Sequence, residues 1–226
     1  MDTLIITILP SVMILGYFIY NDKFKEPTNL ILTVFFLGFL ICLPAGILNE
    51  FSENQFFTGT DLSKRLVYSF LGPAWAEEIL KFLILYLIVL RRNEFNEPMD
   101  GIVYGVTVSL GFATFENYDY VFRLAKEWSV DPYQMAIWRS YSAVPMHGLM
   151  GCIMGFYFGM YAFSANKKYL ILCLVIPFII HGLYNFLPHP THFMVLGVVI
   201  IYSIALHSQF KKMQGKKNEE KEQKKI

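Results

Sequence analysis

Charged side chains are scarce in this sequence of 226 residues. Asp, Glu, Lys and Arg together make up 16% of the chain, whereas typical soluble domains contain about 25%. Apolar residues reach 55% and aromatic residues 17%, with 21 phenylalanines among them. This balance excludes an ordinary soluble domain and indicates a membrane protein.

Cysteines and recognisable binding motifs are also few. The three cysteines, Cys42, Cys152 and Cys173, lie in apolar segments, which favours small buried side chains over a disulfide framework. The sequence shows no nucleic-acid-binding motif, no glycine-rich phosphate loop and no internal repeat, so no nucleic-acid partner is expected. No Lys or Arg precedes Lys23, and we therefore expect residues 3–20 to be an uncleaved membrane span and not a secretory signal.

Long apolar runs, by contrast, are abundant. A run of about 20 apolar residues is long enough to cross a bilayer as a helix. Seven such runs cover residues 3–20, 28–48, 66–90, 99–122, 138–162, 169–187 and 192–210. The sequence therefore predicts an all-α polytopic membrane protein, with one integral membrane domain over residues 1–210 in contact with the lipid bilayer. The longest loop is predicted at 49–65 and a polar connection at 123–137.

The distribution of basic residues favours one orientation. Residues 211–226 carry seven Lys and three Glu, a net charge of +4, and are predicted to be a solvated or lipid-touching basic tail without a site of its own. With that tail in the cytoplasm, the cytoplasmic loops hold Lys23, Lys25, Arg91, Arg92, Lys167 and Lys168. The outer loops then keep Lys64, Arg65 and Lys126, with Arg123 and Arg139 at span ends. Because basic residues concentrate in cytoplasmic loops, we expect the N-terminus outside and the C-terminus inside.

Two adjacent acids lie within the third apolar run. Glu77 and Glu78 follow Pro73 by about one helical turn, and Lys81 lies four and three residues beyond them, so both acids can meet it on one helix surface. A carboxylate near the bilayer centre costs roughly 2.5–3.5 kcal/mol. An ion pair that only joined two helices would need one acid and one base, so the additional carboxylate indicates chemistry.

Further polar residues lie at similar depth in spans four to six. Glu116 and His147 each lie on a helical face that is otherwise made of small residues, which permits close contact with a neighbouring helix. His181 and Asn185 are four residues apart and project the same way. The small residues are Gly101, Gly105, Ser109 and Ala113 in span four, and Gly151, Gly155 and Gly159 in span five. We expect a polar site among helices three to six.

The ordered motifs resemble those of PrsW-type intramembrane proteases, which belong with the CAAX-prenyl proteases and the bacteriocin-immunity proteins. The resemblance extends from residue 17 to residue 186. The matching motifs are Tyr20-x-Asp22-x-x-x-Glu26-Pro27, Glu77-Glu78-x-x-Lys81, Asp100-Gly101-Ile102-Val103-Tyr104-Gly105, Phe112-x-x-x-Glu116-Asn117, His147-Gly148 and His181-x-x-x-Asn185.

This resemblance implies a protease of the bacterial cell membrane that makes the first, outward-side cut in a single-pass anti-sigma factor. It implies that Glu77 activates water, that Glu78 orients and balances charge with Lys81, and that His181 and Asn185 stabilise the tetrahedral intermediate. CAAX proteases usually have a His where this chain has Glu116, which leaves His147 as a candidate partner of Glu77.

Two alternatives stay open at the level of sequence. Three acids and two histidines could ligate zinc, but the His-Glu-x-x-His pattern is absent, and no metal or other cofactor is expected. A proton-coupled transporter would also bring acids, histidines and Pro-broken helices to mid-membrane. The lack of an internal repeat, and the placement of the polar groups in one half of the membrane, favour the protease.

Overall fold

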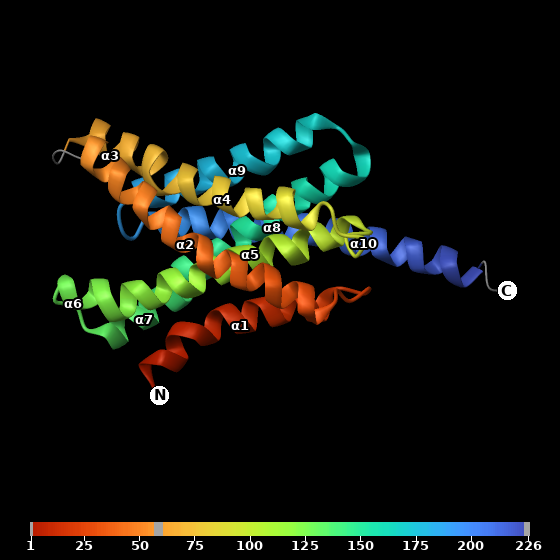
Figure 1. Ribbon diagram of the computed structural model, residues 1–226, viewed down its shortest axis with the longest axis horizontal. Helices are drawn as coiled ribbons and strands as arrows, with labels where there is room; N and C mark the ends of the chain where they lie inside the picture. The colour runs from red at the N-terminus through yellow and green to blue at the C-terminus, as the bar shows by residue number, and fades with distance from the viewer. Residues whose placement is uncertain (1, 57–60, 224–226) are drawn as a thin grey trace.

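The computed structural model describes residues 2–56 and 61–223. In these ranges the chain forms helices that run up and down one long axis (Figure 1), so the all-α prediction is confirmed. Five helical stretches are long and apolar enough to cross a membrane: Thr3–Asn21, Thr28–Gln55, Pro132–Ser164, Lys167–Phe186 and His192–Lys216. The two other predicted spans, 66–90 and 99–122, carry the acid pair and Glu116 and are also helical.

The first two helices are α1 (Thr3–Asn21) and α2 (Thr28–Phe56). The Asp2 carboxylate caps α1 by accepting a hydrogen bond from the Leu4 N–H at 3.1 Å. The loop predicted at 49–65 is wrong for most of its length, because α2 continues to Phe56 and the next helix begins at Leu62. Polar residues at a membrane surface can extend a helix because water solvates their side chains. Residues 57–60 lie outside the described ranges.

The third rod is interrupted where the sequence has Gly72 and Pro73. It consists of α3 (Leu62–Ser69), the π-helical turn η1 (Phe70–Ala74), α4 (Trp75–Ile84) and a second π-helical turn, η2 (Leu85–Val89). Gly72 has non-helical torsions, φ −86° and ψ −114°, and Pro73 has no N–H to donate. Since α4 starts anew at Trp75, Glu77 and Glu78 lie in its first turn.

The polar connection predicted at 123–137 is largely helical. The helix α5 (Pro98–Asp119) runs on through η3 (Tyr120–Leu124) and α6 (Ala125–Glu127), and α7 (Pro132–Tyr141) follows after four residues. Ser142, with φ −121° and ψ −81°, separates α7 from α8 (Ala143–Ser164). The fifth rod is therefore two helices, and the break lies just before His147.

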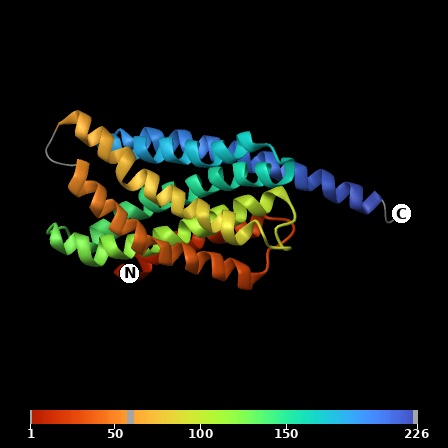
Figure 2. The ribbon, with the colours of Figure 1, turned by 45° about the horizontal axis from the view of Figure 1, so that its top comes forward.

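The last two rods are α9 (Lys167–Phe186) and α10 (His192–Gln223). The far end of α10 projects beyond the bundle in both views (Figures 1 and 2). The expectation of a solvated tail is wrong at Gln214, which is only 5% exposed. Its Nε2 donates to Asp22 Oδ1 at 2.7 Å and to Glu97 Oε1. The tail therefore begins as a continuation of the membrane helix, and its first turns are fixed to two loops of the bundle.

The central contact of the bundle is between α5 and α8. The two small-residue stripes, each expected to meet a neighbouring helix, meet each other. A Cβ atom on Gly105 would lie 2.4 Å from the Gly151 carbonyl oxygen, and one on Gly155 would lie 2.1 Å from the Gly101 oxygen. Both distances are shorter than any side chain tolerates. Small residues thus let two helix backbones touch where the hydrophobic effect gives no preference for helix contact over lipid.

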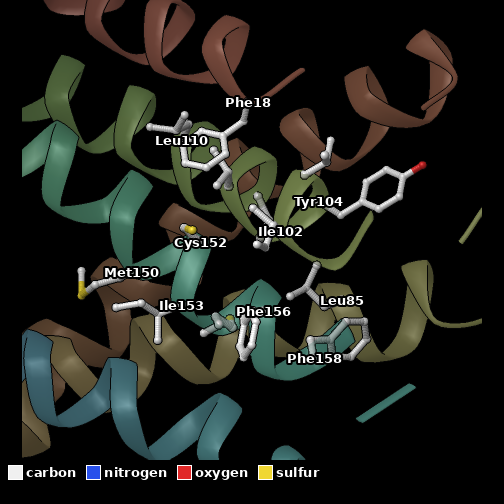
Figure 3. Close-up of a cluster of buried hydrophobic side chains, with 14 of the residues drawn as sticks. Phe18, Leu85, Ile102, Tyr104, Leu110, Met150, Cys152, Ile153, Phe156 and Phe158 are labelled. Atoms are coloured by element: carbon white, nitrogen blue, oxygen red, sulfur yellow. The ribbon is translucent and has the colours of Figure 1, made fainter. Parts of the chain in front are cut away.

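The apolar core forms around this contact (Figure 3). Leu110 of α5 lies beside Phe18 of α1 in this view, and Ile102 of α5, with Cys152, Ile153 and Phe156 of α8, belongs to the same buried apolar cluster. Cys152 and Cys173 are buried as predicted, whereas Cys42 is half-buried, and all three are free thiols. Because α5 is enclosed by other helices along most of its length, it can carry polar side chains that a lipid-facing helix would exclude.

Candidate active site

The first turn of α4 presents the acid pair to the interior of the bundle. Glu77, Glu78 and Lys81 are 2%, 1% and 0% exposed. Lys81 Nζ lies 2.8 Å from Glu78 Oε1 and 3.7 Å from Glu77 Oε2, which confirms the predicted pairing of one ammonium with two carboxylates. The ammonium also lies 4.4 Å from the centre of the Phe112 ring, a favourable position for a buried cation.

His147 of α8 reaches the same cluster from the opposite side. Its Nδ1 lies 3.1 Å from Lys81 Nζ, and its Nε2 lies 3.1 Å from Glu116 Oε2. An ammonium can only donate and a carboxylate can only accept. These contacts therefore assign the neutral tautomer of His147 with the proton on Nε2, and both ring nitrogens are occupied.

His181 of α9 has a different environment. Its Nδ1 lies 2.9 Å from Glu78 Oε1, and its Nε2 lies 4.0 Å from Glu77 Oε2. The second distance is too long for a direct hydrogen bond, but one water molecule could contact both atoms. The geometry therefore makes His181, and not His147, the imidazole that faces Glu77 with a nitrogen available.

Asn185 lies one turn beyond His181 but does not join the network. It is half-buried, and its side chain makes no hydrogen bond to another residue in the described parts of the chain. Its predicted place beside His181 on one face of α9 is consistent with the helix, while its predicted role is not tested by these contacts.

Two polar residues of the site were not predicted as site residues. Asn49 of α2 donates from Nδ2 to Glu77 Oε1 at 3.2 Å. Arg139 of α7 contacts Glu116 Oε2 through Nη2 and Asn117 Oδ1 through Nε, the latter at 2.8 Å. Asn49 follows a long apolar run and Arg139 stands at the start of one, so their patterns resemble ordinary span ends. A charged residue just inside a predicted span was the only signal available for Arg139.

The cluster combines three carboxylates with two permanent cations and two imidazoles. Among the described residues, Glu77 Oε2 and Glu78 Oε2 are buried without a hydrogen-bond partner. Two groups of three residues bring their ligand atoms within 4.8 Å of one another: Glu77 with Glu116 and His147, and Glu77 with Glu78 and His181. Glu77 is the residue common to both groups.

The fold and this cluster define a class of protein, namely a polytopic helical membrane protein with an ionisable site enclosed by its helices. Such groups are expensive in a membrane and mark functional sites. A family model described as the PrsW family intramembrane metalloprotease matches residues 26–207. The chain belongs to this family and is therefore a membrane-embedded peptidase, and the transporter alternative is set aside.

Individual relatives agree with the family match. The chain is 39% identical over 184 residues to the protease PrsW of Bacillus subtilis (strain 168), covering 80% of this chain and 79% of that protein. It is 35% identical over 183 residues to the protease PrsW of Geobacillus kaustophilus (strain HTA426), covering 80% and 76%. The chain is 29% identical over 215 residues to the protease PrsW of Clostridioides difficile (strain 630), covering 91% of this chain and 87% of that protein. No solved structure matches the chain significantly.

Proposed function

We propose that this protein cleaves a single-pass membrane protein, an anti-sigma factor, in the bacterial cell membrane, and that Glu77 activates the attacking water. The observation that carries the catalytic assignment is the buried Glu77 Oε2, which has no hydrogen-bond partner among the described residues and lies 4.0 Å from His181 Nε2. Water between these atoms would donate to Glu77 Oε2 and accept from a protonated His181 Nε2, in a dry, enclosed surrounding that strengthens each electrostatic contact.

Glu78 is the less suitable base. Its Oε1 accepts from both Lys81 and His181, at 2.8 and 2.9 Å, so its charge is already used to hold these two groups. Among the described residues, Glu77 accepts one side-chain hydrogen bond, from Asn49 Nδ2 at 3.2 Å. Asn49 fixes one Glu77 oxygen, and the other oxygen is buried without a hydrogen-bond partner among the described residues.

The steps of hydrolysis follow from these positions. The water oxygen attacks the scissile carbonyl carbon while its proton passes to Glu77 Oε2, and the carbonyl π electrons move to the oxygen. His181 holds one proton on Nδ1 against Glu78. We place on its Nε2 the single proton that balances the charge of the site, so that Nε2 donates a hydrogen bond to the carbonyl oxygen while Glu77 stays ionised and takes the proton from water. We assign oxyanion stabilisation to protonated His181 and the Asn185 amide, and the proton from water finally reaches the leaving amine as the C–N bond breaks.

The family is described as one of metalloproteases, and the donor types of this site fit a metal ion. Glu77 with Glu116 and His147, or with Glu78 and His181, would hold a divalent ion such as zinc, which when bound would polarise the carbonyl and activate water. The charges support the metal-free route. Three carboxylates face Lys81 and Arg139, which leaves one negative charge, and one proton balances it without a metal ion.

The site lies toward one end of the bundle, and we propose that this end is the outer side. Asn117, next to Glu116, donates to the Thr7 carbonyl near the start of α1 at 2.7 Å. The basic loops and tail favour an outer N-terminus. Cleavage outside the membrane or within its outer leaflet would then leave the substrate with its full transmembrane segment.

The proposal is tested by coexpressing the protein with candidate single-pass anti-sigma factors and following their processing. Wild type should cut one of them, and Glu77→Gln should insert normally but cut none. Glu127→Gln, at an exposed acid on α6, is the matched control and should cut like wild type. Mass spectrometry of the product should place its new N-terminus on the outer side. Cleavage by Glu77→Gln at the wild-type rate would refute the assignment of the base.

A further inference from the structure

Arg139 is a buried cation that contacts Glu116 of the site. It lies on the short helix α7, before the break at Ser142, and is 9% exposed. Its guanidinium carbon lies 3.8 Å from the centre of the Tyr120 ring, and its Nε donates to Asn117 Oδ1 at 2.8 Å. These two contacts fix the guanidinium over the Tyr120 ring and leave Nη2 to pair with Glu116 Oε2.

The Glu116 oxygen that pairs with Arg139 also accepts from His147 Nε2, at 3.1 Å. A carboxylate held by an arginine stays ionised and fixed in direction. It therefore requires the His147 proton to be on Nε2, and the Nδ1 lone pair then points at Lys81 Nζ, 3.1 Å away. Through Glu116 and His147, Arg139 therefore influences where the Lys81 ammonium lies, and this ammonium pairs with Glu78.

Loss of Arg139 would alter this chain of contacts in a specific way. Glu116, with a side chain 17% exposed, would keep its charge without its strongest partner, and Lys81 is the other permanent cation of the cluster. The Lys81 ammonium would then be the single counter-ion of three carboxylates in the cluster, and His147 would no longer be restricted to one tautomer.

We propose that Arg139 is a positioning residue of the active site: by fixing Glu116 it selects the Nε2–H tautomer of His147 and directs Lys81 toward the acid pair. Its effect on cleavage rests on the proposed function, whereas its effect on the His147 tautomer does not. No contact of Arg139 with substrate is involved.

Kinetics of cleavage test the first effect, using the single-pass substrate identified by coexpression. We expect Arg139→Gln to lower kcat about 100-fold with little change in KM, since small misplacement of catalytic groups has costs of this size. Arg139→Lys keeps the charge and should recover a large part of the loss. Arg123→Gln is the matched control, because Arg123 pairs with Asp119 and Glu127 at the surface and should be neutral.

A double variant separates positioning from simple structural support. In a Glu116→Gln background, Arg139→Gln should change kcat by less than about threefold, because residues acting through one partner are not additive. If Arg139 only anchored α7 to α5, the fold-decrease in kcat caused by Arg139→Gln would multiply with the fold-decrease caused by Glu116→Gln. A full 100-fold further loss in the double variant would overturn the proposal.

The tautomer itself can be read by ¹⁵N NMR of histidine-labelled protein in lipid bilayers, with His147→Gln used for assignment. We expect wild type and Arg139→Lys to show a protonated Nε2 and an unprotonated Nδ1 on His147, and Arg139→Gln to show a mixture of both tautomers. An unchanged single tautomer in Arg139→Gln, or a protonated Nδ1 in wild type, would refute the inference. If wild type cleaves no substrate, the proposed function fails while this measurement still decides the role of Arg139.

Discussion

Replacing Lys81 by Met should reveal how far the site depends on one buried ammonium. Lys81 is 0% exposed, and its Nζ lies 2.8 Å from Glu78, 3.7 Å from Glu77 and 3.1 Å from His147. Met fills a similar volume without charge. The substitution therefore removes the counter-charge of two buried carboxylates and leaves the packing against Phe112 nearly unchanged.

The expected loss follows from these contacts. Removing one partner of a buried ion pair costs about 3–5 kcal/mol, because the other charge stays buried and unpaired. A typical hydrogen bond between membrane helices contributes about 0.6 kcal/mol. We therefore expect Lys81→Met to lower the free energy of unfolding by about 3–5 kcal/mol, several times the effect of an ordinary interhelical contact.

Unfolding by sodium dodecyl sulfate in mixed micelles, followed by the fluorescence of the three tryptophans, measures this loss. The exposed Lys126 provides the matched control, and Lys126→Met should change stability by less than about 0.5 kcal/mol. The double variant Lys81→Met/Glu78→Gln should be more stable than Lys81→Met alone, because it removes the unpaired charge. A loss below about 1 kcal/mol for Lys81→Met, or a double variant with strictly additive losses, would show that the ammonium is not the counter-ion of the acid pair.

Three further outcomes are expected. Purified enzyme should keep its activity in strong chelators and contain no stoichiometric zinc, because one proton balances the site; activity lost and restored together with one zinc per chain would contradict this. Gly155→Val should destabilise the protein by about 3 kcal/mol in the same unfolding assay, since a Cβ there meets the Gly101 oxygen at 2.1 Å, whereas Gly16→Val, with nothing within 4 Å of its Cβ, should be close to neutral. Burial raises the pKa of Asp22 above its ordinary value. The protonated form therefore contributes fully to stability below a pH of about 4, and this contribution declines as the pH rises through the pKa of the folded state. Asp22→Asn should flatten this part of the stability–pH curve, and an unchanged curve would show that Asp22 is not the titrating group.

Much of the site was predictable because its residues are conspicuous in an apolar sequence. A carboxylate, an imidazole or an ammonium in a membrane span has few explanations, so Glu77, Glu116, His147 and His181 could each be selected without a structure. Their convergence could be expected from similar depth in neighbouring spans, and the contacts bear this out for all four.

Arg139, Asn49 and Gln214 could not be selected in the same way, for a physical reason. Polar residues at the ends of spans are common and inexpensive because water or lipid headgroups solvate them. Only the tertiary fold turns Arg139 inward against Tyr120 and places Gln214 over Asp22. The predicted loop at 49–65 failed for a related reason: hydropathy detects where the apolar run ends, whereas a helix continues as long as its backbone hydrogen bonds are made.

The two breaks in the helices connect the fold to the chemistry. An unbroken third rod would have no new first turn at Trp75, and the acid pair would stand in mid-helix instead of at the start of α4. In an unbroken fifth rod, Arg139 and His147 would lie on one straight helix, eight residues and more than two turns apart. Because Ser142 separates α7 from α8, Arg139 and His147 can both reach one oxygen of Glu116. Gly72–Pro73 and Ser142 therefore do for the polar site what the glycine stripes do for the core: they allow groups that are distant along regular helices to meet at one point inside the bundle.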